Sequence, residues 1–166
     1  TFAYVLHEGK IRILVTQNDV RAIQLAKAAL YAGVRLLMDK LNVDSVDRIR
    51  LAGAFGSHID VKYAMVLGLI PDCRLENVTS AGNAAGSGAH IALVDRNSRE
   101  EIEREIRRIE KIETAVETRF QEHFVEAMAI PHKSAPFDEL AKAVTLPLRT
   151  DAPSDSRSSG RRRRRR

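Results

Sequence analysis

The 166-residue chain carries a formal net charge of +5, but the excess positive charge lies at its C-terminal end. From Arg149 onward there are eight Arg and two Asp, whereas residues 1–148 contain 19 basic and 20 acidic side chains. A neutral body of this length suffices for one domain with a hydrophobic core, and it lacks the basic excess typical of a nucleic-acid-binding domain. No run approaches the roughly 18 consecutive apolar residues that span a bilayer.

Two further expectations concern the role of the single cysteine and the completeness of the sequence. Cys73 cannot form an internal disulfide, and we expect a passive, small apolar side chain in a cytoplasmic protein. The sequence begins at Thr1 and enters strand-like residues at once, which suggests a piece of a longer protein.

Residues 2–41 predict a hairpin followed by a long helix. Strands are expected at 2–8 and 11–16, with a glycine turn between them. A helix is expected from Gln17 to Leu41, because apolar residues recur there at spacings of three and four. This stripe, which we expect to face the core, consists of Val20, Ile23, Leu30, Val34, Leu37 and Leu41.

Lys27 occupies the one place where this stripe lacks an apolar member. Its four-carbon stem could lie along the edge of the core with the ammonium in water. Alternatively, the ammonium could meet a phosphate or the polar edge of a nucleotide in a cleft. The sequence leaves both interpretations open.

The remainder of the body predicts an α/β arrangement of short strands and helices. Strands are expected at 48–52 and 75–79. Helices are expected at 60–68, 83–94, 98–113, 120–128 and 137–144. The helix at 98–113 should begin with a capping box of Ser98 and Glu101, and it should turn its isoleucines toward the core.

Two glycine-rich junctions, at 51–57 and 79–89, give the clearest indication of function. Each follows a strand and leads into a helix, so that glycine allows a close approach of the backbone to a ligand. Together they suggest one nucleotide-sized cleft. Neither has the spacing of a dinucleotide-binding or Walker loop, and no pair of catalytic groups stands out. The five histidines show no metal-ligand spacing, so no metal site is expected.

The order of these segments resembles the C-terminal half of an actin-like ATPase domain. The resemblance rests on the long helix, on Leu51-Ala-Gly-Ala-Phe-Gly-Ser57 and on Ser80-Ala-Gly-Asn-Ala-Ala-Gly-Ser-Gly-Ala-His-Ile-Ala-Leu93. In the superfamily of sugar and acetate kinases, heat-shock chaperones and actin, a glycine turn cups adenosine and a later helix packs across the domain hinge. The resemblance implies a partial actin-like, ribonuclease H-like ATPase lobe over residues 1–148, with flanking C-terminal helices.

Three segments narrow the resemblance to the reductive activators of corrinoid proteins. They are Thr16-Gln-Asn-Asp-Val-Arg-Ala-Ile-Gln-Leu-Ala-Lys-Ala-Ala29, Leu51-Ala-Gly-Ala-Phe-Gly-Ser-His-Ile-Asp60 and Phe120-Gln-Glu-His-Phe-Val-Glu-Ala-Met-Ala-Ile-Pro131. Such ferredoxin-linked proteins use ATP to drive an uphill electron onto cobalt, which restores the Co(I) form of a corrinoid methyl carrier. The resemblance implies ATP or ADP with Mg in the intact protein, an iron-sulfur cluster in a separate N-terminal domain, a corrinoid protein or corrinoid methyltransferase as partner, and a homodimer.

The resemblance also assigns residues to the cleft. The candidate cofactor-binding residues, with Lys27 added from the helix pattern, are Lys27, Gly53, Ala54, Phe55, Gly56, Ser57, Gly82, Asn83 and Gly86. Ala54 stands where the superfamily has the second glycine of a pair. The iron-sulfur cysteines and the early phosphate loop have no counterpart here, so the chain alone is expected not to hydrolyse ATP, and no catalytic residue is assigned.

Two alternatives stay open at this stage. The chain could belong to another actin-like kinase or ATPase. It could also be a non-catalytic module whose Arg-rich tail, residues 149–166, binds RNA or acidic partners by counterion release. We interpret the tail as a disordered, solvated extension, because it lacks the aromatic side chains that stack on bases.

Overall fold

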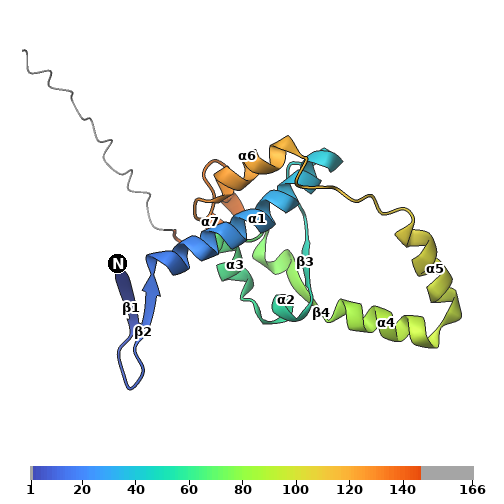
Figure 1. Ribbon diagram of the computed structural model, residues 1–166, viewed down its shortest axis with the longest axis horizontal. Helices are drawn as coiled ribbons and strands as arrows, with labels where there is room; N and C mark the ends of the chain where they lie inside the picture. The colour runs from blue at the N-terminus through green and yellow to red at the C-terminus, as the bar shows by residue number, and fades with distance from the viewer. Residues whose placement is uncertain (1, 147–166) are drawn as a thin grey trace, which may run out of the picture.

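The computed structural model describes residues 2–146, in which short strands alternate with helices (Figure 1). In chain order the elements are β1 (Ala3–His7), β2 (Ile13–Thr16), α1 (Gln17–Leu41), β3 (Ile49–Ala52), α2 (Ala54–His58), α3 (Val61–Leu67), the 3-10 helix η1 (Leu75–Asn77), β4 (Val78–Gly82), α4 (Ala84–Val94), α5 (Arg96–Ile106), α6 (Thr118–Ala127) and α7 (Asp138–Ala143). The predicted disordered tail, 149–166, lies outside the described residues. Within the described part, no helix combines the length and the apolar character needed to cross a membrane.

The N-terminal hairpin is an antiparallel pair, as predicted, but its strands are shorter than expected. The pairing runs from Ala3 opposite Thr16 to His7 opposite Ile13. Residues 8–12 connect the strands, so the loop is longer than the predicted two-residue turn. The hairpin projects from the N-terminal end of α1 (Figure 1).

Helix α1 begins and ends where the sequence predicts. Thr16 caps it, because its Oγ1 accepts a hydrogen bond from the Asp19 N–H at 3.3 Å. The Asp19 carboxylate in turn accepts from the Thr16 N–H at 2.8 Å and from its hydroxyl, and these bonds lower the pKa of Asp19. At the other end Asn42 adopts the left-handed conformation, with a φ of 54°, and closes the helix.

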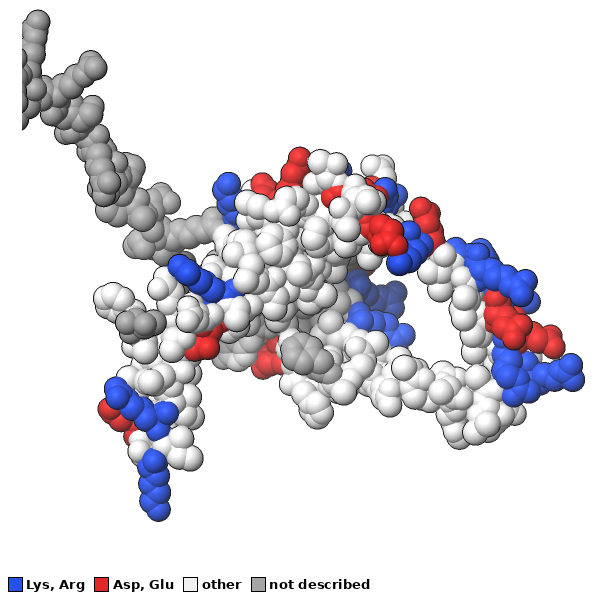
Figure 2. Space-filling view, viewed as in Figure 1, with Lys and Arg blue, Asp and Glu red and all other residues white. Residues whose placement is uncertain are grey.

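The apolar stripe of α1 does not face the core, so that prediction is wrong. Ile23 is 44% exposed, Leu30 50% and Leu37 52%. The buried residues of α1 are instead Lys27, Ala28, Tyr31, Ala32, Leu36 and Met38. Helix α6 packs against this other face of α1, and beside the apolar contacts the Gln24 side chain donates to the Met128 carbonyl. In one view, the body of the molecule around α1 shows few charged side chains (Figure 2).

Strands β3 and β4 form a two-stranded parallel sheet. Ile49 lies opposite Val78, and Ala52 lies opposite Gly82. The second strand begins at Val78, three residues later than predicted, because Leu75–Asn77 form η1. Since the strands are parallel, their carboxyl ends lie at the same edge of the sheet.

The core lies where α1, α3, α6 and α7 meet this sheet. Its buried members are Ala28, Tyr31, Ala64, Met65, Ile70, Cys73, Val78, Ala127, Phe137 and Leu140. The Cys73 thiol is buried, as predicted, and donates to the Asp47 carbonyl at 3.4 Å. Burial raises the pKa of this thiol, so it is poorly suited to act as a nucleophile.

Helices α4 and α5 project from this core (Figure 1), and neither contains a buried residue. The cap of α5 is Asp95, whose carboxylate accepts from the N–H groups of Asn97 and Ser98 at 3.1 and 3.0 Å. The predicted capping box at Ser98 is therefore wrong, because Asp95 caps the helix three residues earlier. The isoleucines of α5, which were predicted to face inward, are exposed. Charges of both signs lie side by side along this helix (Figure 2).

Lys27 is the one fully buried charged side chain among the described residues, with an exposure of 0%. Its ammonium donates to the carbonyl oxygens of Ala129 and Pro131, the latter at 2.6 Å. A Cβ atom added at Gly68 would lie 3.1 Å from the ammonium nitrogen. Lys27 therefore ties α1 to the turn after α6 and lies close to Gly68 at the end of α3, and burial lowers its pKa to about 8.

We predict that Lys27→Met lowers the free energy of unfolding by about 2 kcal/mol at neutral pH, because two part-buried carbonyls lose their donor. Urea denaturation followed by circular dichroism measures the loss. Lys40→Met is the matched control on the same helix, since Lys40 is half exposed and pairs with Glu117 at the surface. Its loss should stay below about 1 kcal/mol. Equal losses in the two variants would contradict the role given to Lys27.

The lowered pKa of Lys27 also gives stability a defined pH dependence. Between about pH 8 and the ordinary value of 10.5, the unfolded chain binds a proton that the folded chain has released. The wild-type free energy of unfolding should therefore rise with pH across this window, relative to Lys27→Met, by up to about 3 kcal/mol. Urea denaturation of both proteins at steps from pH 8 to 10.5 tests this, and parallel pH profiles would refute it.

Candidate functional site

The parallel sheet places the two glycine turns side by side. Gly53 follows β3 and Gly82 ends β4, and the Gly53 N–H donates to the Gly82 carbonyl at 2.8 Å. The two junctions that the sequence singled out are thus joined by a direct backbone hydrogen bond. Helices α2 and α4 begin from the same edge of the sheet, which is where ligands bind in open α/β sheets.

Both turns need glycine for their conformation, and both leave space beside the backbone. The φ angle is 95° at Gly53 and 62° at Gly82, a region that other residues rarely adopt. A Cβ atom added at either position would meet no heavy atom within 4 Å. The positive φ accounts for glycine at both positions, and the open space beside each backbone segment would also admit a ligand.

The rest of the first turn forms the short helix α2. Ala54, Phe55 and Ser57 lie in it, and Ala54 and Ser57 are exposed. The Ser57 hydroxyl donates to the Gly53 carbonyl at 3.0 Å, and the Ser57 N–H donates to the same oxygen at 3.2 Å. These two hydrogen bonds from Ser57 hold the turn in shape.

Gly56 and Gly86 serve the packing of the chain itself. A Cβ atom at Gly56 would lie 3.0 Å from the backbone and Cβ of Leu51, so glycine here lets α2 sit directly on β3. A Cβ atom at Gly86 would lie 2.5 Å from the Asn83 side-chain nitrogen. Gly86 therefore leaves room for the amide that caps α4.

The second turn is organised by two polar side chains. Asn83 caps α4, with its side-chain oxygen accepting from the Gly86 N–H at 3.0 Å. The Ser80 hydroxyl accepts from the Gly82 N–H at 3.2 Å. Ser80 is not among the predicted site residues, because the strand was expected to end at Thr79, whereas β4 continues to Gly82.

The two turn segments carry no charged side chain. Segments 51–58 and 79–94 contain no Lys, Arg, Asp or Glu. A ligand at this edge would meet backbone dipoles, hydroxyls and one amide, and it would form no ion pair with these two segments.

The structure removes Lys27 from this candidate site. The predicted nucleotide contact through its ammonium is wrong, because the side chain is fully buried and donates to the carbonyls of Ala129 and Pro131. The glycine that lies next to the Lys27 ammonium is Gly68, which ends α3 and belongs to neither glycine turn. The gap in the apolar stripe therefore marks a structural lysine.

Among the described residues, no three His, Cys, Asp or Glu side chains come together in a way that could hold a metal ion. His58, at the end of α2, is exposed. The paired turns thus offer a ligand open space and backbone hydrogen-bonding groups. In the part of the chain that the structure describes, no pair of titratable side chains suited to acid–base chemistry lies beside them.

Comparison with known proteins agrees with this architecture. The profile of the family described as the C-terminal domain of RACo, the ASKHA domain, matches residues 1–141. The corrinoid activation enzyme RamQ of Eubacterium limosum is 47% identical over 91 residues, which cover 54% of this chain and 15% of that protein. A solved structure, the reductive activator for corrinoid, iron-sulfur protein, matches with a TM-score of 0.66 and 34% identity, over 74% of this chain and 20% of that one.

The chain therefore spans a fifth or less of the length of these relatives. The predicted α/β, actin-like ATPase fold is confirmed, and so is the resemblance to corrinoid activators. The match over residues 1–141 includes β1 through most of α7 and both glycine turns. The chain belongs to the family of RACo C-terminal ASKHA domains, whose relatives activate corrinoid proteins.

Proposed function

We propose that this chain provides the adenosine-binding wall of an ATP-dependent activator that reduces the cobalt of a corrinoid protein to Co(I). One observation carries the proposal: the hydrogen-bonded turns at Gly53 and Gly82, which leave open space beside two backbone segments. Membership of the corrinoid activator family supports the assignment of this space to an adenine nucleotide.

The residues present fit an adenosine group. In this proposal Gly53, Ala54 and Ser57 line one side of the nucleoside, while Gly82 and Asn83 line the other. Ala54 is exposed, and its methyl group reduces the space that a glycine would leave, which limits how closely the nucleoside approaches α2. The uncharged lining is consistent with a role for this edge in holding the nucleoside, with the phosphates and Mg held by segments outside this sequence.

ATP, when bound, supplies the free energy that makes the uphill electron transfer possible. In this proposal the chain's own residues bind and orient the nucleoside. Helix α4 starts at Ala84, directly after Asn83. It connects the turn to the arm that α4 and α5 form, in which no residue is buried. Nucleotide binding would then favour one arrangement of this arm over others, because a ligand shifts a conformational equilibrium only through differential binding.

The names of the relatives support the choice of partner. One is a corrinoid activation enzyme, and the other is a reductive activator for a corrinoid, iron-sulfur protein. We propose a corrinoid protein or corrinoid methyltransferase as the partner, an iron-sulfur domain as the electron carrier of the intact activator, and a cytoplasmic homodimer as its working form.

Calorimetric titration with adenosine tests the assignment directly. Adenosine is uncharged, so an Arg-rich tail cannot contribute to its binding by ion pairing. We predict that the chain binds adenosine and ADP, and that Gly53→Ala weakens adenosine binding at least about tenfold, because the added methyl group occupies the open space beside the turn. The same substitution should lower the free energy of unfolding by only about 1 kcal/mol, from the strained φ.

Gly88→Ala is the matched control. Gly88 lies within α4, and a Cβ atom there would also meet nothing within 4 Å. Its adenosine affinity should equal that of the wild type. A folded chain that binds no adenosine, or equal losses in the two variants, would remove the glycine turns from the nucleotide site.

A further inference from the structure

The interface between α1 and α6 contains a charge cluster that the proposed function does not use. The carboxylate of Asp39, on α1, is 11% exposed and lies 2.6 Å from His123 Nε2 and 3.1 Å from Arg119 Nη1, both on α6. Arg35, one turn earlier on α1, approaches it at 3.4 Å. One part-buried carboxylate thus contacts two guanidinium groups and an imidazole.

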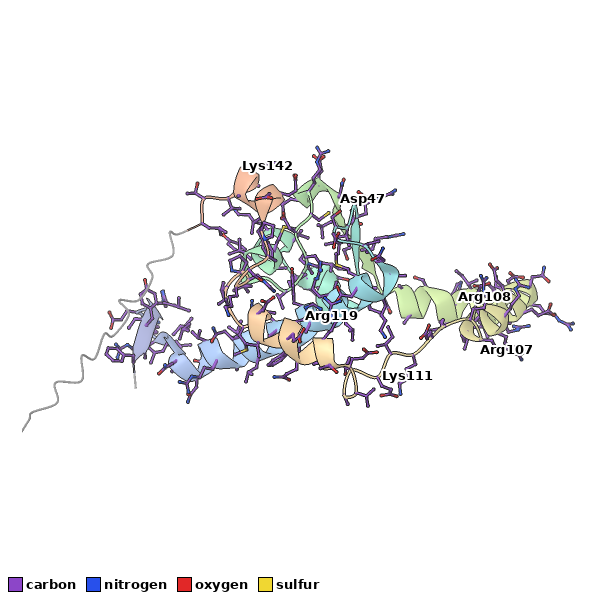
Figure 3. The ribbon with its side chains drawn as sticks, turned by 90° about the horizontal axis from the view of Figure 1, so that it is seen from above. Asp47, Arg107, Arg108, Lys111, Arg119 and Lys142 are labelled. Carbon is purple, nitrogen blue, oxygen red and sulfur yellow. The ribbon has the colours of Figure 1, made fainter. Side chains whose placement is uncertain are left out.

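These side chains form a wall of a cavity of about 350 Å³, here called the α1–α6 pocket. Its polar lining residues are Tyr31, Arg35, Arg119, His123, Glu126, His132 and Ser134. Asp39 is not part of the lining, but its carboxylate contacts three residues that are, namely Arg35, Arg119 and His123. Arg119 projects from α6 where that helix overlies α1 (Figure 3).

The loop that closes the α1–α6 pocket is fixed by His132. Its Nδ1 accepts from the Ser134 N–H at 3.2 Å and from the Ala135 N–H at 2.9 Å, so this nitrogen carries no proton. The imidazole is 6% exposed, and burial lowers its pKa. A neutral, firmly bonded imidazole therefore shapes the wall opposite α6 and brings the Ser134 hydroxyl to Glu126, at 3.0 Å.

The donors of the pocket outnumber its acceptors. A guanidinium has five N–H groups in a planar fork that matches carboxylate and phosphate oxygens. Within residues 2–146, the Arg119 guanidinium contacts one carboxylate, that of Asp39, through one nitrogen. Glu126 is the single carboxylate in the lining, and the Ser134 hydroxyl already donates to it. Arg35 donates to the Asp44 carbonyl at 3.5 Å and to the Asp39 carboxylate at 3.4 Å. The other N–H groups of the two guanidinium groups are thus available to an oxyanion, and the Arg119 side chain is 59% exposed.

We propose that the α1–α6 pocket binds a small oxyanion, a carboxylate or a phosphate group, through Arg119 and Arg35. Asp39 positions both arginines from behind, so it prepares the site without occupying it. Asp39 and Glu126 balance the two guanidinium charges, so binding relies on directional hydrogen bonds, and the expected affinity is in the millimolar range. The pocket lies between α1, α6 and residues 132–136, none of which carries a glycine turn.

Titrations of the full chain with inorganic phosphate and with acetate, at constant ionic strength, test this proposal by NMR. Saturable shifts of the His123 and His132 ring signals are expected with at least one of the two anions, and the stronger one identifies the oxyanion class. Arg119→Gln should weaken binding about fivefold, because it removes a charged donor. Glu126→Gln should strengthen it about threefold, because it removes the one carboxylate in the lining of the pocket.

Two exposed residues outside the pocket provide matched controls. Arg96→Gln on α5 and Glu122→Gln on α6 make the same chemical changes, and both should leave the affinity unchanged. A purely structural role for the cluster would not let Glu126→Gln tighten binding. A folded chain without saturable shifts, or an Arg119→Gln variant that binds like the wild type, would overturn the proposal. Neither result depends on whether the glycine turns bind adenosine.

Discussion

The contact between α1 and α6 decides how the rest of the molecule is arranged. Lys27 donates from α1 to carbonyls just beyond α6, and Asp39 accepts from Arg119 and His123 on α6 itself. Because a buried ammonium and a part-buried carboxylate both need partners, these bonds leave little freedom for the helices to rotate or slide. They turn the apolar stripe of α1 outward and fix the turn beside Gly68, where α3 ends.

The glycine turns depend on a different constraint, the parallel pairing of β3 with β4. The hydrogen bond from the Gly53 N–H to the Gly82 carbonyl extends the pairing one residue beyond β3, to the last residue of β4. Both turns therefore leave the sheet at the same end. Ser57 and Ser80 then fix the two turns from within. The site is therefore built from backbone and short hydroxyls, whereas the α1–α6 pocket is built from long charged side chains on helices.

The features that the sequence predicted are local ones. Helix α1, the hairpin and the two strand-to-helix junctions depend on neighbours in the chain, which a sequence displays. Some local predictions, such as the capping box at Ser98 and the start of β4, were also wrong. The errors that affect the core and the candidate site concern contacts between distant segments. Lys27 finds its acceptors 102 and 104 residues away, and no periodicity within α1 can signal them. The same holds for Asp39 and His123, which are 84 residues apart.

The wrong prediction for the stripe of α1 has a physical consequence. Periodicity identified an apolar face correctly, but it could not identify what covers that face. In the described structure Ile23, Leu30 and Leu37 are about half exposed, and α4 and α5 bury no residue at all. Apolar surfaces of this extent usually mark contacts with other parts of a protein or with partners. The outward stripe of α1 and the surfaces of α4 and α5 are therefore the places where a contact outside the described residues would bury apolar area.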